Sequence, residues 1–177
     1  MGRQKLVLAV RGTPIVRLSV DALRPHVDDL IVVTGRDDSA VREALAGVDV
    51  RFAINPRPQD GQGSSIAIGV AALTPWTRAA LIALGDQPRV PTGVAPALLA
   101  AWTRTGKPIV APVYQGAQGT PVLFAADVFT ELRALSGDSG AKSVVQARRE
   151  RVELIAIDAP MPADVDTPED YARLHVE

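Results

Sequence analysis

The chain has 177 residues, of which 47% are hydrophobic and 22% are charged, and its formal net charge is −1. This composition predicts one folded domain with a hydrophobic core and argues against a disordered chain or a strongly basic nucleic-acid binder. The absence of cysteine excludes a disulfide framework, a thiolate nucleophile and a cysteine-based metal centre. We expect a cytoplasmic protein that is not bound to a membrane, since no apolar run approaches the roughly 20 residues that span a bilayer and no signal peptide is recognisable.

Apolar runs of strand length alternate along the chain with helical patterns. In chain order they predict strands at residues 30–35, 50–55, 79–85, 108–114, 121–124 and 152–158. Helices are predicted at residues 13–25, 39–46, 64–73, 94–105, 126–135, 141–149 and 168–175. This alternation is typical of an α/β fold. We expect a doubly wound, mostly parallel sheet in a three-layer α/β/α arrangement, forming a single domain over residues 1–177.

Several of the predicted helices begin with residues that favour an N-terminal cap. Asp38 or Ser39 precedes the second helix, Ser64 the third, and Thr167 the last, where Pro168 follows at the first helical position. These residues place the starts of the three helices.

The third predicted strand ends in the sequence "LGDQP", in which no lysine or arginine accompanies Asp86. Ligands of such sheets bind at the carboxyl ends of the strands, and Mg²⁺ favours one or two carboxylates together with water and phosphate oxygens. Asp86 is therefore a candidate metal ligand. The alternative, equally compatible with its position, is a carboxylate that caps the turn through backbone N–H groups of the next residues.

The segment after the last strand, "APMPADVDTPEDYARL", is rich in acidic residues. Glu169 and Asp170 fit the first turn of a helix, where the macrodipole favours negative charge. That reason does not extend to Asp164 and Asp166, whose alternation with valine puts both on one side of an extended segment. A second carboxylate close to Asp86 would complete a two-ligand Mg²⁺ site. We expect Asp166 in that role, with Asp164 as the alternative.

The loop "GQGSS" at residues 61–65 opens an apolar helix. Its glycines and serines allow backbone N–H groups and hydroxyls to approach a ligand closely, although an entry turn capped by Ser64 would have the same sequence. The loop also begins like the dinucleotide fingerprint G-x-G-x-x-G. Ile66 replaces the third glycine, and "PRPQD" separates the loop from the preceding strand, so that match is weak.

Six segments, in this order, resemble the molybdenum-cofactor nucleotidyltransferases, and "LGDQP" is most similar to their cytidylyltransferase branch. They are "MGRQKLVLAVRGTPIV", "GQGSSIAIGVAAL", "LGDQPRV", "APVYQGAQGTPVLF", "LSGDSGAK" and "DVDTPEDYARL". The resemblance covers nearly the whole chain. It implies a nucleotide-diphospho-sugar transferase-like fold and Mg²⁺-dependent transfer of a nucleoside monophosphate, with CMP favoured, from CTP or GTP to the phosphate of a molybdopterin-type acceptor, with release of pyrophosphate. A molybdoenzyme or its chaperone would be a possible partner.

The resemblance also assigns roles to individual residues. It implies that Asp86 binds the metal, that Asp166 shares it, and that Lys5, otherwise an ordinary surface lysine, contacts the triphosphate. The binding residues that it implies are Gly2, Gly63, Ser64, Ser65, Gly119, Thr120, Pro121, Gly137 and Asp138. The last five lie in two segments that, by themselves, also fit a tight hairpin and a helix cap. Phosphoryl chemistry needs charge neutralisation and positioning more than a covalent catalyst, which suits a chain without cysteine.

Two departures from the family pattern affect these expectations. Family members often carry His or Asn at the position of Thr120, so the resemblance does not determine the identity of the acceptor. They also begin with a strand and a glycine-rich loop, L-A-A-G-x-S-x-R, just before the position of Met1. We expect a chain without these parts to have exposed strand edges and to bind triphosphate poorly, and we expect its reading frame to start upstream. A weakly catalytic nucleotide- or cofactor-binding homologue, or less favourably an NAD(P)-dependent reductase, is the alternative function.

Overall fold

The computed structural model describes residues 5–138, 140–147 and 149–176. Its longer helices are α1 (Ile15–Leu23), α2 (Ser39–Ala44), α3 (Gln62–Ala71), α4 (Val94–Thr105), α5 (Phe129–Arg133), α6 (Ala141–Ala147) and α7 (Pro168–Val176). The strands are β1 (Ala9–Val10), β2 (Thr13–Pro14), β3 (Ile31–Thr34), β4 (Arg51–Ile54), β5 (Ala79–Ile82), β6 (Ile109–Tyr114), β7 (Ala117–Gln118), β8 (Val122–Ala125) and β9 (Val152–Ile157). Short 3₁₀ turns, η1 (Lys5–Val7) to η5 (Arg149–Arg151), connect some of them. None of the described helices is long and apolar enough to cross a bilayer.

The largest sheet contains β5, β8, β6, β7 and β9. β6 pairs with β9 in parallel, with Ile109 opposite Val152, whereas β8 is antiparallel to both β5 and β6. Two antiparallel steps make β5, β6 and β9 parallel to one another, so their carboxyl ends lie at the same end of the sheet. The antiparallel pairs arise because the chain returns from β6 through the short strand β7 to β8. The α/β class is thus confirmed, with a mixed sheet.

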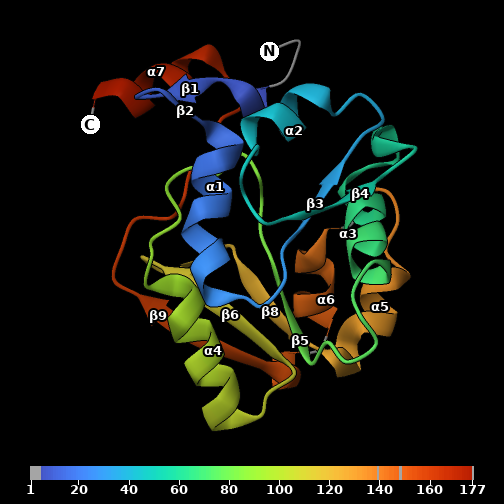
Figure 1. The fold of residues 1–177 in the computed structure, drawn as a ribbon. Coiled ribbons are helices and arrows are strands. Elements are labelled where there is room, and N and C mark those ends of the chain that lie inside the picture. The colour runs from blue at the N-terminus through green and yellow to red at the C-terminus, as the bar shows by residue number, and fades with distance from the viewer. Residues whose placement is uncertain (1–4, 139, 148, 177) are drawn as a thin grey trace.

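The alternation of side chains along β6 produces the three layers. Ile109 and Ala111 face a core formed with α3, α5 and α6, and Val110 and Tyr114 face a second core under α4. In Figure 1 these helices cover opposite faces of the sheet. Because strand side chains point alternately to the two faces, a continuous apolar run such as "PIVAPVY" predicts burial on both sides, as observed.

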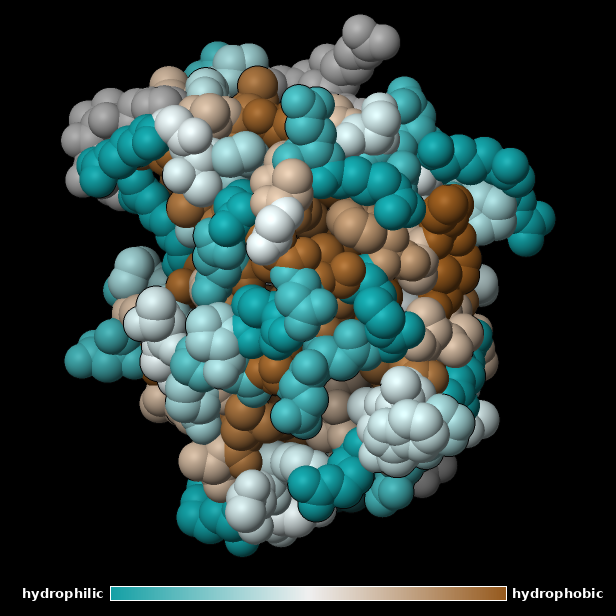
Figure 2. All heavy atoms as spheres, in the orientation of Figure 1, coloured by the Kyte–Doolittle hydropathy of each residue, from teal (hydrophilic) through white to brown (hydrophobic). Residues whose placement is uncertain are grey.

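A second, smaller sheet pairs β3 with β4 in parallel, from Ile31 opposite Arg51 to Thr34 opposite Ile54. Among the described residues no backbone pairing joins this sheet to the larger one, so β3 and β5 each have one unpaired edge. The residues of β5 are all only partly buried. In the orientation of Figure 1, apolar surface interrupts the polar surface in the middle of this face, between α1 and α3 (Figure 2).

The two ends of the described chain lie together in the fold (Figure 1). A small core of Val10, Ile15, Val165 and Leu174 joins the β1–β2 hairpin and α1 to the C-terminal segment and α7. Val165 is 1% exposed, so the residues that flank it are fixed in position. This contact brings the neighbourhood of residue 5 to residues 164–166.

Two predicted boundaries differ from the structure for identifiable reasons. β5 ends at Ile82 rather than at residue 85, because its pairing with β8 ends with Ile82 opposite Val122. α3 begins at Gln62 with Gly61 before it, so Ser64 is not its cap. The cap at Thr167 is confirmed: its hydroxyl accepts the N–H of Asp170, and the Asp170 carboxylate accepts the N–H of Thr167.

Candidate active site

Lys5, Asp86 and Asp166 meet in one cluster, although they are far apart in sequence. The Lys5 ammonium donates to Asp86 Oδ2 and to Asp166 Oδ1, each at 2.6 Å. The Asp86 side chain is 20% exposed, that of Lys5 30% and that of Asp166 65%. The predicted convergence of Asp86 and Asp166 is therefore present. Asp86 also has a cationic neighbour after all, which tertiary contacts supply.

Two sheet strands and the N-terminal 3₁₀ turn deliver these side chains. Asp86 follows the carboxyl end of β5, and Asp166 lies in the extended segment after β9, a strand parallel to β5. The N–H of Val165 donates to the carbonyl of Asp86 at 3.2 Å, which holds the two segments together. The hydroxyl of Ser19 on α1 donates to the carbonyl of Gly85 at 3.0 Å and fixes the turn from the other side.

The electrostatics of the cluster favour a charged lysine. Burial by itself would lower the pKa of Lys5, but hydrogen bonds to Asp166 and Asp86 and the charges of both carboxylates outweigh it and raise the pKa above its ordinary value. Lys5 is therefore a permanent cation at neutral pH, placed between two anions. A cluster with one ammonium and two carboxylates can bind a metal ion and a phosphate chain side by side.

The two carboxylates suit a hard divalent cation. Both oxygens contact the same nitrogen, so they are no farther apart than twice the 2.6 Å contact. Small side-chain rotations would bring both into the first coordination sphere of Mg²⁺ or Mn²⁺, where ligands lie about 2.0–2.2 Å from the ion. The described residues contain no group of three or more His, Asp or Glu side chains that could enclose a metal. The arrangement fits a metal that completes its shell with water and substrate phosphate.

The predicted acceptor-side residue Thr120 is connected to this cluster through Gln87. The Thr120 hydroxyl donates to Gln87 Oε1, and Gln87 Nε2 donates to Asp164 Oδ1 at 2.8 Å. The alternative metal ligand, Asp164, therefore contacts an amide, whereas Asp166 contacts Lys5. Pro121 is buried beside Thr120, and Gly119 packs against the ring of Tyr114, leaving too little space there for a Cβ atom.

The predicted binding loops at residues 61–65 and 137–138 lie against each other. The N–H of Gly63 donates to the carbonyl of Gly137 at 2.9 Å. The hydroxyls of Ser64 and Ser65 accept the two amide hydrogens of Asn55, at 2.8 and 3.0 Å. Asp138 is exposed at the edge of the contact, and Gly2 lies outside the described residues. A cavity of about 260 Å³ opens between the loops, lined by residues that include Asn55, Ser64, Ile68 and Gly137.

We predict that Gly61→Ala separates these two loops. Gly61 has a φ of +89°, and a Cβ there would lie 2.3 Å from the backbone of Gly137. The strain and the overlap together should lower the free energy of unfolding by about 2–4 kcal/mol. Urea denaturation measures this loss. Gly47→Ala is the matched control, because Gly47 also has a positive φ, +77°, but open space around it. Equal losses in the two variants would contradict the loop contact.

Two polar residues of the site were missed by the sequence reasoning. Asn55 is 1% exposed and Gln87 6%, and each is fully hydrogen bonded in the interior. Both lie at the end of a predicted strand: Asn55 is the last residue of "VRFAIN", and Gln87 comes immediately after Asp86. A polar side chain just beyond an apolar strand was the signal, since it lies where the sheet meets its ligand.

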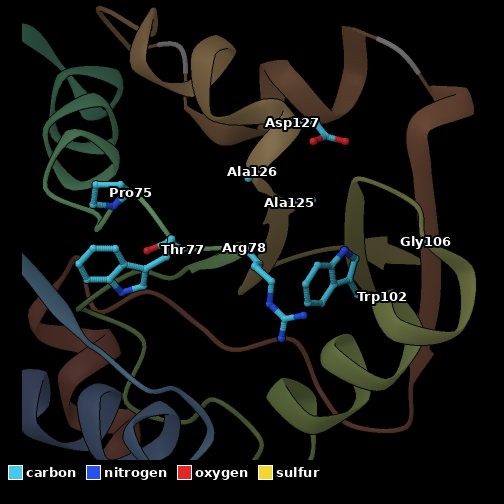
Figure 3. Close-up of a pocket in the computed structure, with 9 residues that line it drawn as sticks. Pro75, Thr77, Arg78, Trp102, Gly106, Ala125, Ala126 and Asp127 are labelled. Carbon is cyan, nitrogen blue, oxygen red and sulfur yellow. The ribbon is translucent and has the colours of Figure 1, made fainter.

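Another cavity, of about 390 Å³, lies elsewhere. Arg78, Trp102 and Asp127 are among its lining residues, and in Figure 3 the Arg78 side chain extends beside the Trp102 ring. Arg78 immediately precedes β5, whereas Asp86 follows it, so this cavity is at the opposite end of that strand. Because substrates of parallel sheets bind at the carboxyl ends, we place the site at Asp86.

The chain is similar to known proteins over most of its length. A model of the MobA-like NTP transferase domain matches residues 1–152. The purine catabolism protein PucB of Bacillus subtilis (strain 168) is 28% identical, over 97% of this chain and 87% of its own length. The manganese complex of Rv0371c from Mycobacterium tuberculosis H37Rv is 33% identical with a TM-score of 0.82, covering 98% of this chain and 92% of the other. A nucleotidyl transferase from Methanothermobacter is 26% identical with a TM-score of 0.74, covering 97% and 83%.

Proposed function

Since the chain belongs to the MobA-like NTP transferase family and is a nucleotidyltransferase, we propose that it transfers CMP from CTP to the phosphate of a molybdopterin-type acceptor. GTP is the alternative donor. The products are the nucleotidylated acceptor and pyrophosphate, and a molybdoenzyme or its chaperone would receive the product. "LGDQP" is the sequence feature that favours the cytidylyl branch.

The observation that carries the proposal is the meeting of Asp86 and Asp166 on the Lys5 ammonium. Unpaired carboxylates at this position would repel a triphosphate, but a divalent cation reverses that repulsion. We propose that Asp86 and Asp166 hold Mg²⁺. The related Rv0371c was crystallised with manganese, which has the same preference for oxygen ligands. The metal would supply charge neutralisation at the triphosphate.

The residues of the chain then have distinct tasks in the reaction. An oxygen of the acceptor phosphate forms a bond to the α-phosphorus of CTP, and the bond from that phosphorus to the α,β-bridging oxygen breaks. The electron pair leaves with pyrophosphate, so negative charge accumulates on the β- and γ-phosphates. Lys5 would leave its carboxylate partners and bind these oxygens as a fixed cation. No side chain has to act as a base, because the attacking oxygen of the acceptor phosphate is already ionised. Any proton that the products take up comes from water.

The loops would hold the two substrates. We assign the nucleotide to the segment at Gly63, Ser64 and Ser65, where the neighbouring cavity of about 260 Å³ lies. The acceptor is assigned to the segments at Gly119–Pro121 and Gly137–Asp138. The Thr120 hydroxyl already donates to Gln87, so Thr120 would act by holding the loop at residues 119–121 in position.

Pyrophosphate release tests the proposal. The purified protein is incubated with Mg²⁺, a molybdopterin-type acceptor and either CTP or GTP, and phosphate is measured after addition of a pyrophosphatase. We expect acceptor-dependent release that is faster with CTP. Faster release with GTP would overturn the donor assignment. No release with either donor, from folded protein that still binds the nucleotide, would favour the alternative of a binding homologue without activity.

A further inference from the structure

Gln87 is buried between the metal-binding segment and the acceptor-side loop. Its side chain is 6% exposed, and both ends of its amide are used. Oε1 accepts the Thr120 hydroxyl hydrogen, and Nε2 donates to Asp164 Oδ1 at 2.8 Å and to the carbonyl of Pro162 at 3.4 Å. The amide therefore spans two loops that are distant in sequence. An amide that is satisfied at both ends has one orientation, because a flip would put like groups against each other.

On the C-terminal side, Gln87 anchors the segment that carries Asp166. Three hydrogen bonds join residues 162–165 to the turn after β5: the two from Gln87 Nε2 and the one from the Val165 N–H to the Asp86 carbonyl. The segment is otherwise irregular, with Asp164 and Asp166 both exposed around the buried Val165. Without the Gln87 contacts, Asp166 would be held by the backbone bond and side chain of Val165, by its own N–H to Asp170 at the start of α7, and by the Lys5 ammonium.

On the acceptor side, the Thr120 loop is held from a second direction. The Tyr114 hydroxyl donates to the Thr120 carbonyl at 2.8 Å, and burial raises the pKa of Tyr114 to about 12. Tyr114 therefore keeps its proton and stays a donor throughout the physiological range. Thr120 is fixed at its carbonyl by Tyr114 of β6 and at its hydroxyl by Gln87. A displacement of the Thr120 loop or of the turn that carries Gln87 would therefore disturb the hydrogen bond between the two side chains.

We propose that Gln87 is a positioning residue that sets the distance between the Asp86 and Asp166 carboxylates and couples it to the Thr120 loop, and that Asp164 is its anchor rather than a metal ligand. The proposal rests on the assignment of Asp86 and Asp166 as metal ligands. Groups that orient metal ligands typically change metal affinity by about 10–100-fold when removed. The amide of Gln87 acts indirectly, by holding the segments that carry the two metal ligands.

Mn²⁺ binding without nucleotide gives a readout that is separate from turnover. Free Mn²⁺ is measured by electron paramagnetic resonance in titrations of the wild type, Gln87→Met and Gln87→Glu. We expect both variants to bind Mn²⁺ at least about tenfold more weakly than the wild type. Methionine keeps the shape of the side chain but makes no hydrogen bonds, and glutamate places an oxygen against Asp164 Oδ1. Thermal unfolding of each protein shows that it is folded.

Two variants of Asp164 separate an anchor from a ligand. Asp164→Asn keeps an oxygen that accepts from Gln87 but loses the charge, so an anchor retains Mn²⁺ affinity within about threefold. Asp164→Ala removes the acceptor and should weaken binding about as much as Gln87→Met. A large loss in Asp164→Asn would overturn the anchor role and make Asp164 a ligand. Gln146 lies on the exposed surface of α6, so Gln146→Met is the control for replacing a glutamine with methionine away from the site.

The outcomes distinguish this inference from the proposed function. Wild-type protein that binds no Mn²⁺, or binds it equally well after Asp86→Asn, would refute the metal assignment itself. Wild-type protein that binds Mn²⁺ through Asp86 while Gln87→Met binds it with unchanged affinity would refute only the positioning role. With the assay of pyrophosphate release, a positioning role predicts that Gln87→Met raises the KM of the acceptor along with the metal requirement, since the Thr120 loop loses its contact.

Discussion

Asp86→Asn should lower kcat/KM for metal-dependent pyrophosphate release by about 1,000-fold, a loss of roughly 4 kcal/mol of transition-state stabilisation. Asp86 is the less exposed of the two carboxylates, at 20% against 65% for Asp166, and it lies in the turn after β5. It should therefore be the firmer ligand. The asparagine keeps the volume and one oxygen but not the charge that binds the cation. Asp166→Asn should be affected less, because that side chain is exposed enough for water to take its place.

The fold should tolerate this substitution. The asparagine amide still has an oxygen that accepts from Lys5, and the backbone bond from Val165 to residue 86 is unchanged. The control is Asp127→Asn, an exposed aspartate at the far end of β5, which should keep full activity. Initial rates over a range of Mg²⁺ concentrations measure both. Full activity in Asp86→Asn at saturating Mg²⁺ would show that the metal lies elsewhere.

Lys5→Met should affect metal binding and turnover in opposite directions. The ammonium occupies the space between the two carboxylates, at 2.6 Å from each, and competes with a cation for them. Its removal should tighten Mn²⁺ binding in the absence of nucleotide by about tenfold, since the metal no longer displaces a salt bridge. Turnover should fall by about 100-fold or more, because a fixed cation at the departing pyrophosphate is lost. Titration with Mn²⁺ and steady-state rates give the two values.

The control for Lys5 is Lys5→Arg, which keeps the charge and should retain more activity than Lys5→Met but bind Mn²⁺ no more tightly than the wild type. Weaker Mn²⁺ binding in Lys5→Met would mean that Lys5 supports the carboxylates and does not compete with the metal.

The raised pKa of Lys5 predicts how stability depends on pH. The ammonium form is favoured in the folded state, so its contribution is fully present below the unfolded-state pKa, roughly 10.4. The contribution is lost as the pH rises through the higher folded-state pKa. In the absence of metal, the wild type should therefore keep its stability advantage over Lys5→Met up to roughly pH 10.4 and lose it as the pH rises further. Urea midpoints measured from pH 8 to 11 test this sign.

Local patterns determined the elements of this protein. The apolar runs "LIVVTG", "VRFAIN" and "PIVAPVY" predicted β3, β4 and β6 to within a residue or two, because strand residues need apolar side chains on the faces that the helices cover. Thr167 and Asp170 marked the start of α7 because a cap is a contact between residues three apart. The carboxylate at the end of a strand, Asp86, was visible for the same local reason.

Tertiary structure alone decided which of these residues meet. Asp86 has its cation in Lys5, 81 residues away, and Asp166 reaches it from the other end of the chain. Asp164 and Asp166 share a pattern in the sequence, but Gln87 takes one and Lys5 the other. The ends of the strands also could not be predicted from local patterns, since β5 stops where its pairing with β8 stops, at Ile82 opposite Val122. The sequence determined the residue types and their local structure, because those depend on near neighbours, while the pairing of charges and amides depends on packing between segments that only the fold brings together.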